Sequence, residues 1–340
     1  MLISVLAPVL VFGIIVLVHE GGHFAAAKLT GMRVDEFAIG FGPVIWSKKY
    51  GETLYSLRLI PLGGFNKIAG MEAGDAKVPR SFAGKPVWAR LLVICAGSFM
   101  NILLAFAIFT GITYSLGIQS LPDRPVIGSV ISDSPAERAG LTDGDILLTI
   151  DGKPVSQWTD IARELKDKAN RVVPITYERA GETKAISLIP QESEGRTIVG
   201  IMAKMNRKPV SFGEAFVIGT KQSLFVTGAV FDGIVQMVTG RATEDVAGPL
   251  GIARMAGTVA EVGFLQFLLF IGIISLNLGL LNLFPIPMLD GGILFLTIAE
   301  ALVGRKLPEP ALYYIQMAGI AILLGLFLLG TMNDITRMMK

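Results

Sequence analysis

The chain has 340 residues, of which 52% are hydrophobic and only 17% charged, and its mean hydropathy is +0.60. Soluble globular proteins carry about 25% charged residues, so this composition excludes an ordinary soluble domain and is typical of a membrane protein. The net charge of +2 gives no indication of a nucleic-acid partner. The single cysteine, Cys95, has no partner for an intrachain disulfide and is expected to be a small buried apolar residue.

Four stretches lack charge over a length sufficient to cross a bilayer, which requires roughly 20 helical residues. These stretches are residues 2–18 (continuing into His19), 91–122, 262–289 and 311–333. A cleaved signal peptide is the alternative for the first stretch, because residues 25–27 (AAA) resemble a cleavage site. No Lys or Arg precedes its apolar core, so we expect an uncleaved membrane helix.

The first polar region, residues 28–90, contains ten Lys/Arg and five Asp/Glu. Short basic loops stay in the cytoplasm, so we expect this region inside and both termini outside, together with the second polar region at 123–261. Two basic residues near the C-terminus, Arg337 and Lys340, weakly favour the opposite orientation. Residues 34–59 are rich in glycine and β-formers, and apolar and polar side chains alternate at 55–59, which predicts strands.

The second polar region contains a predicted compact module at residues 122–206. Its signature is GSVI at 128–131, SPA at 134–136, AGL at 139–141 and GDILLTIDG at 144–152. Short strands alternate with a capped helical turn, and the pair Asp151 and Gly152 predicts a hairpin. This pattern resembles a PDZ domain, a fold that binds peptides by adding a strand to its sheet edge. An amphipathic helix is predicted to follow.

The chain contains only two histidines, His19 and His23, and they stand four residues apart in the sequence HEGGH. Residues i and i+4 share one face of a helix, so both imidazoles can bind one metal ion. Glu20 lies beside the first histidine and can act as general base on a metal-bound water. An acidic side chain inside a membrane helix costs about 2.5–3.5 kcal/mol, which a bound dication offsets. The alternative, a polar cytoplasmic helix end beside Lys28, is less favoured.

A catalytic zinc site normally has three protein ligands and one open position. The chain has no third histidine, so the third ligand is expected to be a carboxylate. The best candidate is Asp290, the first charge after the third apolar stretch, in the sequence NLFPIPMLDGG at 282–292. The two prolines are expected to interrupt the helix and let Asp290 turn inward. The alternative is an interfacial aspartate that ends a helix.

The HExxH motif in the first apolar stretch and LDG at 289–291 in the third resemble the site-2 protease family of intramembrane zinc metalloproteases. The PDZ-like insertion resembles the bacterial single-PDZ branch, the regulator-of-sigma proteases that cleave anti-sigma factors. Three further motifs support the resemblance: PLGGF at 61–65, GSFMN at 97–101 and AGPLGI at 247–252. The resemblance implies that His19, His23 and Asp290 bind Zn²⁺ and that Glu20 activates water.

The implied fold is an α-helical polytopic membrane protein with four transmembrane helices, an inserted α+β PDZ-like domain and a β-rich membrane-associated loop. The expected segments are the first transmembrane helix with the zinc motif (1–30), the β-rich loop (31–90), the second transmembrane helix (91–121), the PDZ-like domain (122–206), an amphipathic connecting region (207–261), the third transmembrane helix with the LDG motif (262–292), a short connection (293–310) and the fourth transmembrane helix (311–333).

The resemblance also implies residues that contact the substrate. Asn101 and Asn282 would hydrogen-bond to an unwound substrate backbone, and Gly63 and Gly64 would line the cavity. A helix must open before its peptide bond is attacked, and bare amides in lipid are costly unless they are paired. The alternative for each asparagine is a helix–helix hydrogen bond. The strands of the first loop are expected to pair with the extended substrate by β-addition.

The sequence departs from the family at Gly21 and Gly22, since relatives usually carry a bulky residue after the glutamate. Each glycine costs about 0.8–1.0 kcal/mol relative to alanine in a helix interior, which bears on the rigidity of the site. Ile293 stands where relatives often carry histidine, and this change removes no proposed ligand.

The expected function is zinc-dependent cleavage of single-span membrane proteins, such as anti-sigma factors or signal-peptide remnants, after a prior extracytoplasmic cut. The expected location is the bacterial cytoplasmic (inner) membrane, with the active site toward the cytoplasm and the PDZ-like domain outside, where it binds a substrate ectodomain or C-terminus. One alternative is an inactive, membrane-anchored peptide-binding scaffold, which has no need of intramembrane charge. Another is a metal transporter, which would distribute charged residues over several spans.

Overall fold

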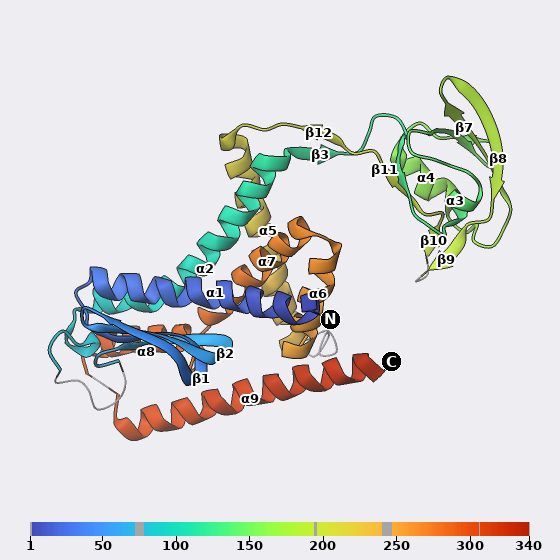
Figure 1. The fold of residues 1–340 in the computed structure, drawn as a ribbon. Helices are drawn as coiled ribbons and strands as arrows, with labels where there is room; N and C mark the ends of the chain where they lie inside the picture. Colours follow the sequence, from blue (N-terminus) through green and yellow to red (C-terminus); the bar gives the residue numbers. More distant parts are fainter. Residues whose placement is uncertain (1, 72–77, 194–195, 240–246, 306, 340) are drawn as a thin grey trace. The chain divides into compact units, whose positions relative to one another are not determined.

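The computed structural model describes residues 2–71, 78–193, 196–239, 247–305 and 307–339. The chain forms two compact units, the first made of Met1–Ile112 with Gly213–Lys340 and the second of Thr113–Phe212. Within the described residues, four helices are long and apolar enough to cross a membrane (Figure 1). They are α1 (Leu2–Leu29), α2 (Val87–Leu116), α7 (Phe264–Asn282) and α9 (Glu309–Met339). Each of the four predicted spans therefore overlaps one of these helices.

The helical part of the first unit is built on one apolar cluster. Val11 and Ile15 of α1 are buried in it with Phe109 of α2 and Leu276 of α7. Three further helices belong to this unit: α5 (Phe212–Val238), α6 (Pro249–Val262) and α8 (Asp290–Val303). The predicted amphipathic helix thus corresponds to α5, and residues 240–246 of the connecting region lie outside the described residues.

The predicted strands form two long antiparallel elements, β1 (Val34–Tyr50) and β2 (Thr53–Ile68). Both strands are interrupted by register shifts, so the inner segment 36–39 pairs with 54–57 on one side and with 64–67 on the other. The sheet therefore has four segments in the order 64–68, 34–39, 53–58 and 44–50. Segment 64–68 is an edge, and it lies against α1, because a Cβ on Gly64 would come within 3.3 Å of Glu20 Cγ.

The turn of this hairpin is attached to the end of α1. The Glu52 carboxylate accepts hydrogen bonds from Arg80 at 2.8 and 2.9 Å and from Lys28 at 2.7 Å. The bonds from Arg80 and then from Lys28 lower the pKa of Glu52 to about 2. Glu52 therefore remains ionised across the physiological range and keeps the hairpin oriented on the helix.

The predicted break in the third apolar stretch is confirmed, because α7 ends at Asn282 and α8 begins at Asp290. The expected short connection at 293–310 is wrong over most of its length, since α8 continues to Val303. No proline or charge interrupts the apolar sequence after Gly292 until Glu300, so the helix propagates. It ends at Gly304, whose φ of 74° is readily adopted by glycine.

The second unit contains a four-stranded sheet in the order β6-β5-β7-β8 and several two-stranded pairs. Its elements are β3 (Ile118–Ser120), β4 (Ile127–Val130), α3 (Pro135–Arg138), β5 (Ile146–Ile150), β6 (Lys153–Pro154), α4 (Trp158–Leu165), β7 (Val173–Arg179), β8 (Glu182–Leu188), β9 (Gln191–Ser193), β10 (Arg196–Ile198), β11 (Ile201–Ala203) and β12 (Asn206–Lys208). The predicted hairpin turn is confirmed, because Asp151 and Gly152 have φ of 55° and 76° and join paired strands β5 and β6.

A buried ion pair fixes the chain in this module. Asp145 is fully buried and accepts from Arg179 Nε at 2.7 Å and Arg179 Nη2 at 2.6 Å. Burial opposes ionisation, but the hydrogen bonds and charge of Arg179, together with a hydrogen bond from the backbone of Thr142, lower the pKa of Asp145 below its ordinary value. The pair holds β7 to the residues that precede β5.

Helix α9 is attached to α6 by a buried carboxylate. Asp334 is 3% exposed and accepts hydrogen bonds from the backbone nitrogens of Gly248 at 3.0 Å and Gly251 at 2.8 Å. These nitrogens belong to the first turn of α6, where backbone donors lack partners within the helix. Asp334 therefore caps α6 from another helix.

We predict that Asp334→Ala destabilises the protein by about 1–3 kcal/mol, because a buried amide at Gly248 and a half-buried amide at Gly251 lose their acceptor. The measurement is the thermal unfolding midpoint in detergent. Thr336→Ala is the control, since the Thr336 hydroxyl donates to the carbonyl of Met332 in its own helix. Equal midpoints for the two variants would contradict the capping role.

Candidate metal centre

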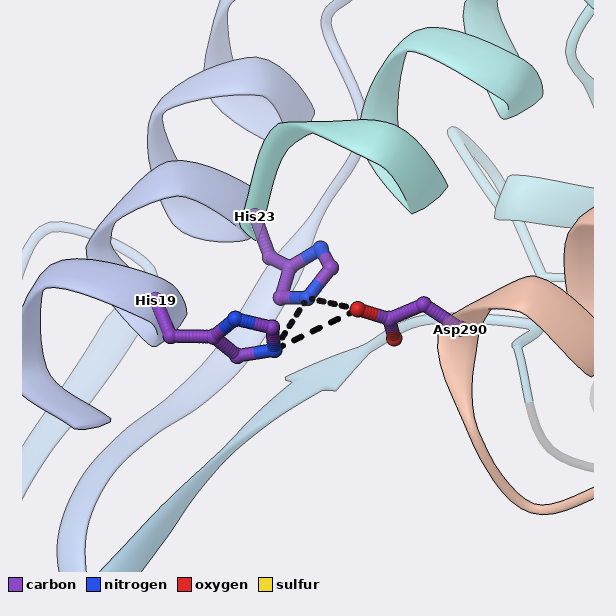
Figure 2. Close-up of side chains that lie close together, drawn as sticks. All are labelled: His19, His23 and Asp290. Carbon is purple, nitrogen blue, oxygen red and sulfur yellow. Dashed lines mark hydrogen bonds and ion pairs between the residues drawn. The ribbon is translucent and has the colours of Figure 1, made fainter. Parts of the chain in front are cut away.

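Helix α1 presents both histidines on one face, and Asp290 approaches them from the start of α8 (Figure 2). His19 Nε2 and His23 Nε2 are 3.2 Å apart, and each lies 3.3 Å from Asp290 Oδ2. Both histidines are almost fully buried, at 8% and 7% exposed. Three donor atoms from two distant parts of the sequence therefore converge on one point.

The turn between α7 and α8 brings Asp290 to this point. Hydrogen bonds close the turn internally, from Phe284 N to Leu281 O at 3.1 Å and from Leu289 N to Ile286 O at 3.1 Å. The turn packs so tightly on the start of α8 that a Cβ on Gly291 or Gly292 would overlap the backbone at 283–287. The two glycines after Asp290 are thus required for the close return of the chain.

Both imidazoles have a second partner on α2. His23 Nδ1 lies 2.7 Å from the carbonyl oxygen of Val93, which only accepts, so Nδ1 carries the proton and the lone pair of Nε2 is free. His19 Nδ1 lies 3.3 Å from the side-chain amide of Asn101, whose Oδ1 is buried and lacks a partner among the described residues. A rotation of this amide by 180° would let Oδ1 accept from a protonated His19 Nδ1, which satisfies both groups.

The donor set and its spacing fit zinc. Zn²⁺ takes imidazole nitrogen and carboxylate oxygen at about 2.0–2.2 Å in tetrahedral geometry, which places neighbouring ligand atoms roughly 3.3 Å apart. The observed separations are 3.2 and 3.3 Å. Two histidines and one carboxylate also leave the fourth position open, as in catalytic zinc sites.

Two glycines allow α1 and α2 to approach closely at the centre. A Cβ on Gly97 of α2 would overlap the imidazole rings of His19 and His23. A Cβ on Gly22 of α1 would lie 2.5 Å from the carbonyl oxygen of Ala96. The close packing of α1 on α2 therefore requires a glycine at position 22, which explains one of the two unusual glycines. Gly21 has open space around its Cα.

Glu20 contacts the edge segment of the sheet. Asn66 Nδ2 lies 2.7 Å from Glu20 Oε2 and 2.7 Å from the backbone oxygen of Glu20. The sequence offered no signal for this contact, because a single asparagine near the end of a strand is unremarkable. The role of Val93 was equally invisible, since its backbone carbonyl makes the contact.

The remaining predicted site residues are Asn282, Asn101, Gly63 and Gly64. Asn282 ends α7, and its amide nitrogen lies 3.4 Å from His19 Nε2 on the metal side. Asn101 is fully buried behind His19, so its expected contact with substrate stays a prediction. Gly64 begins the edge segment of the sheet, Gly63 directly precedes it, and both are half-buried.

We predict that Gly97→Ala weakens zinc binding by at least about tenfold, because the added methyl group displaces both imidazoles. The effect is measured as the amount of zinc that each chain retains after dialysis against chelators of increasing affinity. Gly111→Ala is the matched control on the same helix, since nothing lies within 4 Å of its added Cβ. Equal zinc retention in the two variants would show that the rings do not depend on this contact.

The glycine pair in α1 allows a second comparison. We predict that Gly21→Ala raises the stability by up to about 1 kcal/mol, because alanine is the better helix former and space is available. Gly22→Ala should lower it, since its methyl group meets the backbone of α2. The thermal unfolding midpoints of the two variants, measured in the same detergent, test this difference. A lower midpoint in both variants would contradict the free space inferred beside Gly21.

Known proteins similar to this chain include zinc metalloproteases. The family model of peptidase family M50 matches residues 7–326. A Clostridium acetobutylicum protein whose name places it among the zinc metalloproteases is 35% identical over 335 residues, which is 98% of this chain and 97% of the relative. The regulator of sigma-W protease RasP of Bacillus subtilis is 29% identical, with 98% of this chain and 99% of RasP covered.

A solved PDZ domain of an SdrC-like protein from Listeria monocytogenes is 21% identical and covers 26% of this chain and 94% of its own, with a TM-score of 0.23. The four apolar helices and the membrane protease relatives indicate a multi-pass membrane protein. Because the family model spans nearly the whole sequence, the chain belongs to peptidase family M50, the site-2 protease family, and is a zinc metalloendopeptidase.

Proposed function

We propose that this metalloendopeptidase cleaves single-span membrane proteins within or beside the bilayer, with His19, His23 and Asp290 as zinc ligands and Glu20 as the proton carrier. The observation that carries the proposal is the buried triangle of donor atoms with sides of 3.2 and 3.3 Å between two apolar helices and the start of a third. An isolated carboxylate at this depth would be costly, and a bound dication offsets that cost.

The chemistry divides between the metal and the chain. Zinc supplies Lewis-acid activation of the scissile carbonyl and lowers the pKa of water toward about 7. The Glu20 carboxylate takes the proton of the attacking water and delivers it to the departing amide nitrogen. Val93 keeps His23 in the tautomer that leaves Nε2 free. Asn101 would do the same for His19 with its side-chain amide rotated by 180°, so that Oδ1 accepts from Nδ1.

The substrate is proposed to bind as an extended strand along the edge segment 64–68. Within the described residues, no strand pairs with the outer side of this segment. Addition there would satisfy the backbone of an unwound helix, which is costly to leave bare in lipid. Asn282 is half-buried on the metal side and can pair with a further substrate amide.

The sheet is also proposed to contact the membrane. Residues 41–60 of the hairpin expose large apolar side chains, among them Phe41, Val44, Ile45, Trp46, Tyr50, Leu57, Leu59 and Ile60. Aromatic and aliphatic groups of this kind are typical of a surface at the membrane interface. With the basic first loop inside, the active site faces the cytoplasm of a bacterial inner membrane and the PDZ-like module lies outside. There it would bind the ectodomain or C-terminus of a substrate that a first protease has trimmed.

We predict that the purified protein in detergent cuts a model single-span substrate with a shortened ectodomain, and that a zinc chelator stops the reaction. Glu20→Gln should bind one zinc per chain and lose activity by at least about 10²-fold, because the proton acceptor is gone. The assay follows product formation and zinc content in the same samples.

His23→Gln is the companion variant, and it should lose both zinc and activity, since a ligand is removed. Loss of zinc in Glu20→Gln would instead make Glu20 a ligand. If the wild type binds peptides but neither holds zinc nor cuts any trimmed substrate, the anchored scaffold is the correct description. A substrate with its full ectodomain tests the requirement for a first cut.

A further inference from the structure

Asn66 is the one side chain of the edge segment with two hydrogen bonds to the proposed general base. It lies on β2 opposite Phe37 and 46 positions after Glu20 in the sequence. One amide nitrogen donates both to Glu20 Oε2 and to the backbone oxygen of Glu20, each at 2.7 Å. An amide nitrogen carries two hydrogens, so both bonds form at the same time.

We propose that Asn66 is a positioning residue that holds the Glu20 carboxylate in the orientation needed for proton transfer, an inference that rests on the proposed function of Glu20. A glutamate side chain has three rotatable bonds, and on a helix surface its carboxylate is otherwise free to swing. A donor that bonds both ends of the same residue fixes the side chain relative to its own backbone. With Oε2 engaged, Oε1 is the oxygen left for water.

The orientation of the Asn66 amide is set by Glu20. Its Oδ1 is buried and has no hydrogen-bond partner within the described part of the chain. A reversed amide would place Oδ1 against two acceptor oxygens at 2.7 Å, which is repulsive. The bond to a carboxylate is charge-assisted and therefore stronger than the bond between neutral groups.

A purely structural tether between the sheet and α1 is the competing explanation. It would be served by the bond to the backbone oxygen of Glu20 alone, and its loss would loosen the edge segment. Such loosening would weaken substrate binding, which raises KM and leaves the rate at saturating substrate unchanged, or would weaken zinc retention, which lowers that rate in proportion to the zinc lost. The division between kcat and KM, taken together with the zinc content, therefore separates the two explanations.

The experiment compares Asn66→Leu, which matches asparagine in size and lacks the donor, with wild type, and uses Asn66→Ala in case leucine is not accommodated. We expect kcat to fall about 10–100-fold, the usual effect of removing an outer partner, with KM within about twofold and zinc content unchanged. Asn206→Leu is the control, because Asn206 is exposed in the inserted module. It should retain wild-type kinetics.

An unchanged kcat, a loss confined to KM, or a loss of zinc that parallels the loss of activity would each overturn the positioning role. These outcomes differ from failure of the proposed function, in which wild type itself does not cut or Glu20→Gln remains active. A wild type that cuts, an inactive Glu20→Gln and a fully active Asn66→Leu would reject only the role of Asn66.

Discussion

The centre depends on the close approach of α1 and α2. Because Gly22 and Gly97 lack side chains, the two helices meet backbone to backbone, and both imidazoles lie directly on α2. Only at this separation does His23 reach the carbonyl of Val93 at 2.7 Å. The tautomer of His23, and with it the availability of Nε2, therefore follows from helix packing rather than from the HExxH motif alone.

The third donor requires a broken helix inside a membrane protein, which is tolerated only where protein covers the freed backbone groups. The turn at 283–289 meets this condition by its own hydrogen bonds and by its contact with α9, where a Cβ on Gly319 would overlap Pro287. Helix α9 is itself held by Asp334 at the start of α6. The position of Asp290 thus depends on contacts that extend well beyond its own turn.

Much of this organisation was predictable from the sequence, and the two features that were not have different causes. The motif HExxH, the prolines before Asp290 and the Asp151–Gly152 turn are local signals whose physics acts within a few residues. Helix α8 was missed because its 14 residues are too few to be recognised as a membrane span. The contact of Asn66 with Glu20 joins positions 46 apart, and only the register of the sheet brings them together.

The same sheet edge connects substrate binding to chemistry. Segment 64–68 carries Asn66, and it is also where an extended substrate is proposed to add. An intact transmembrane helix has its backbone groups already paired, so it gains nothing from this edge and does not present a peptide bond beside Glu20. A segment that unwinds gains a strand partner and meets a general base fixed by that strand. Selection for unwound substrates would then follow from the backbone alone, without any requirement for a particular side chain at the cleaved bond.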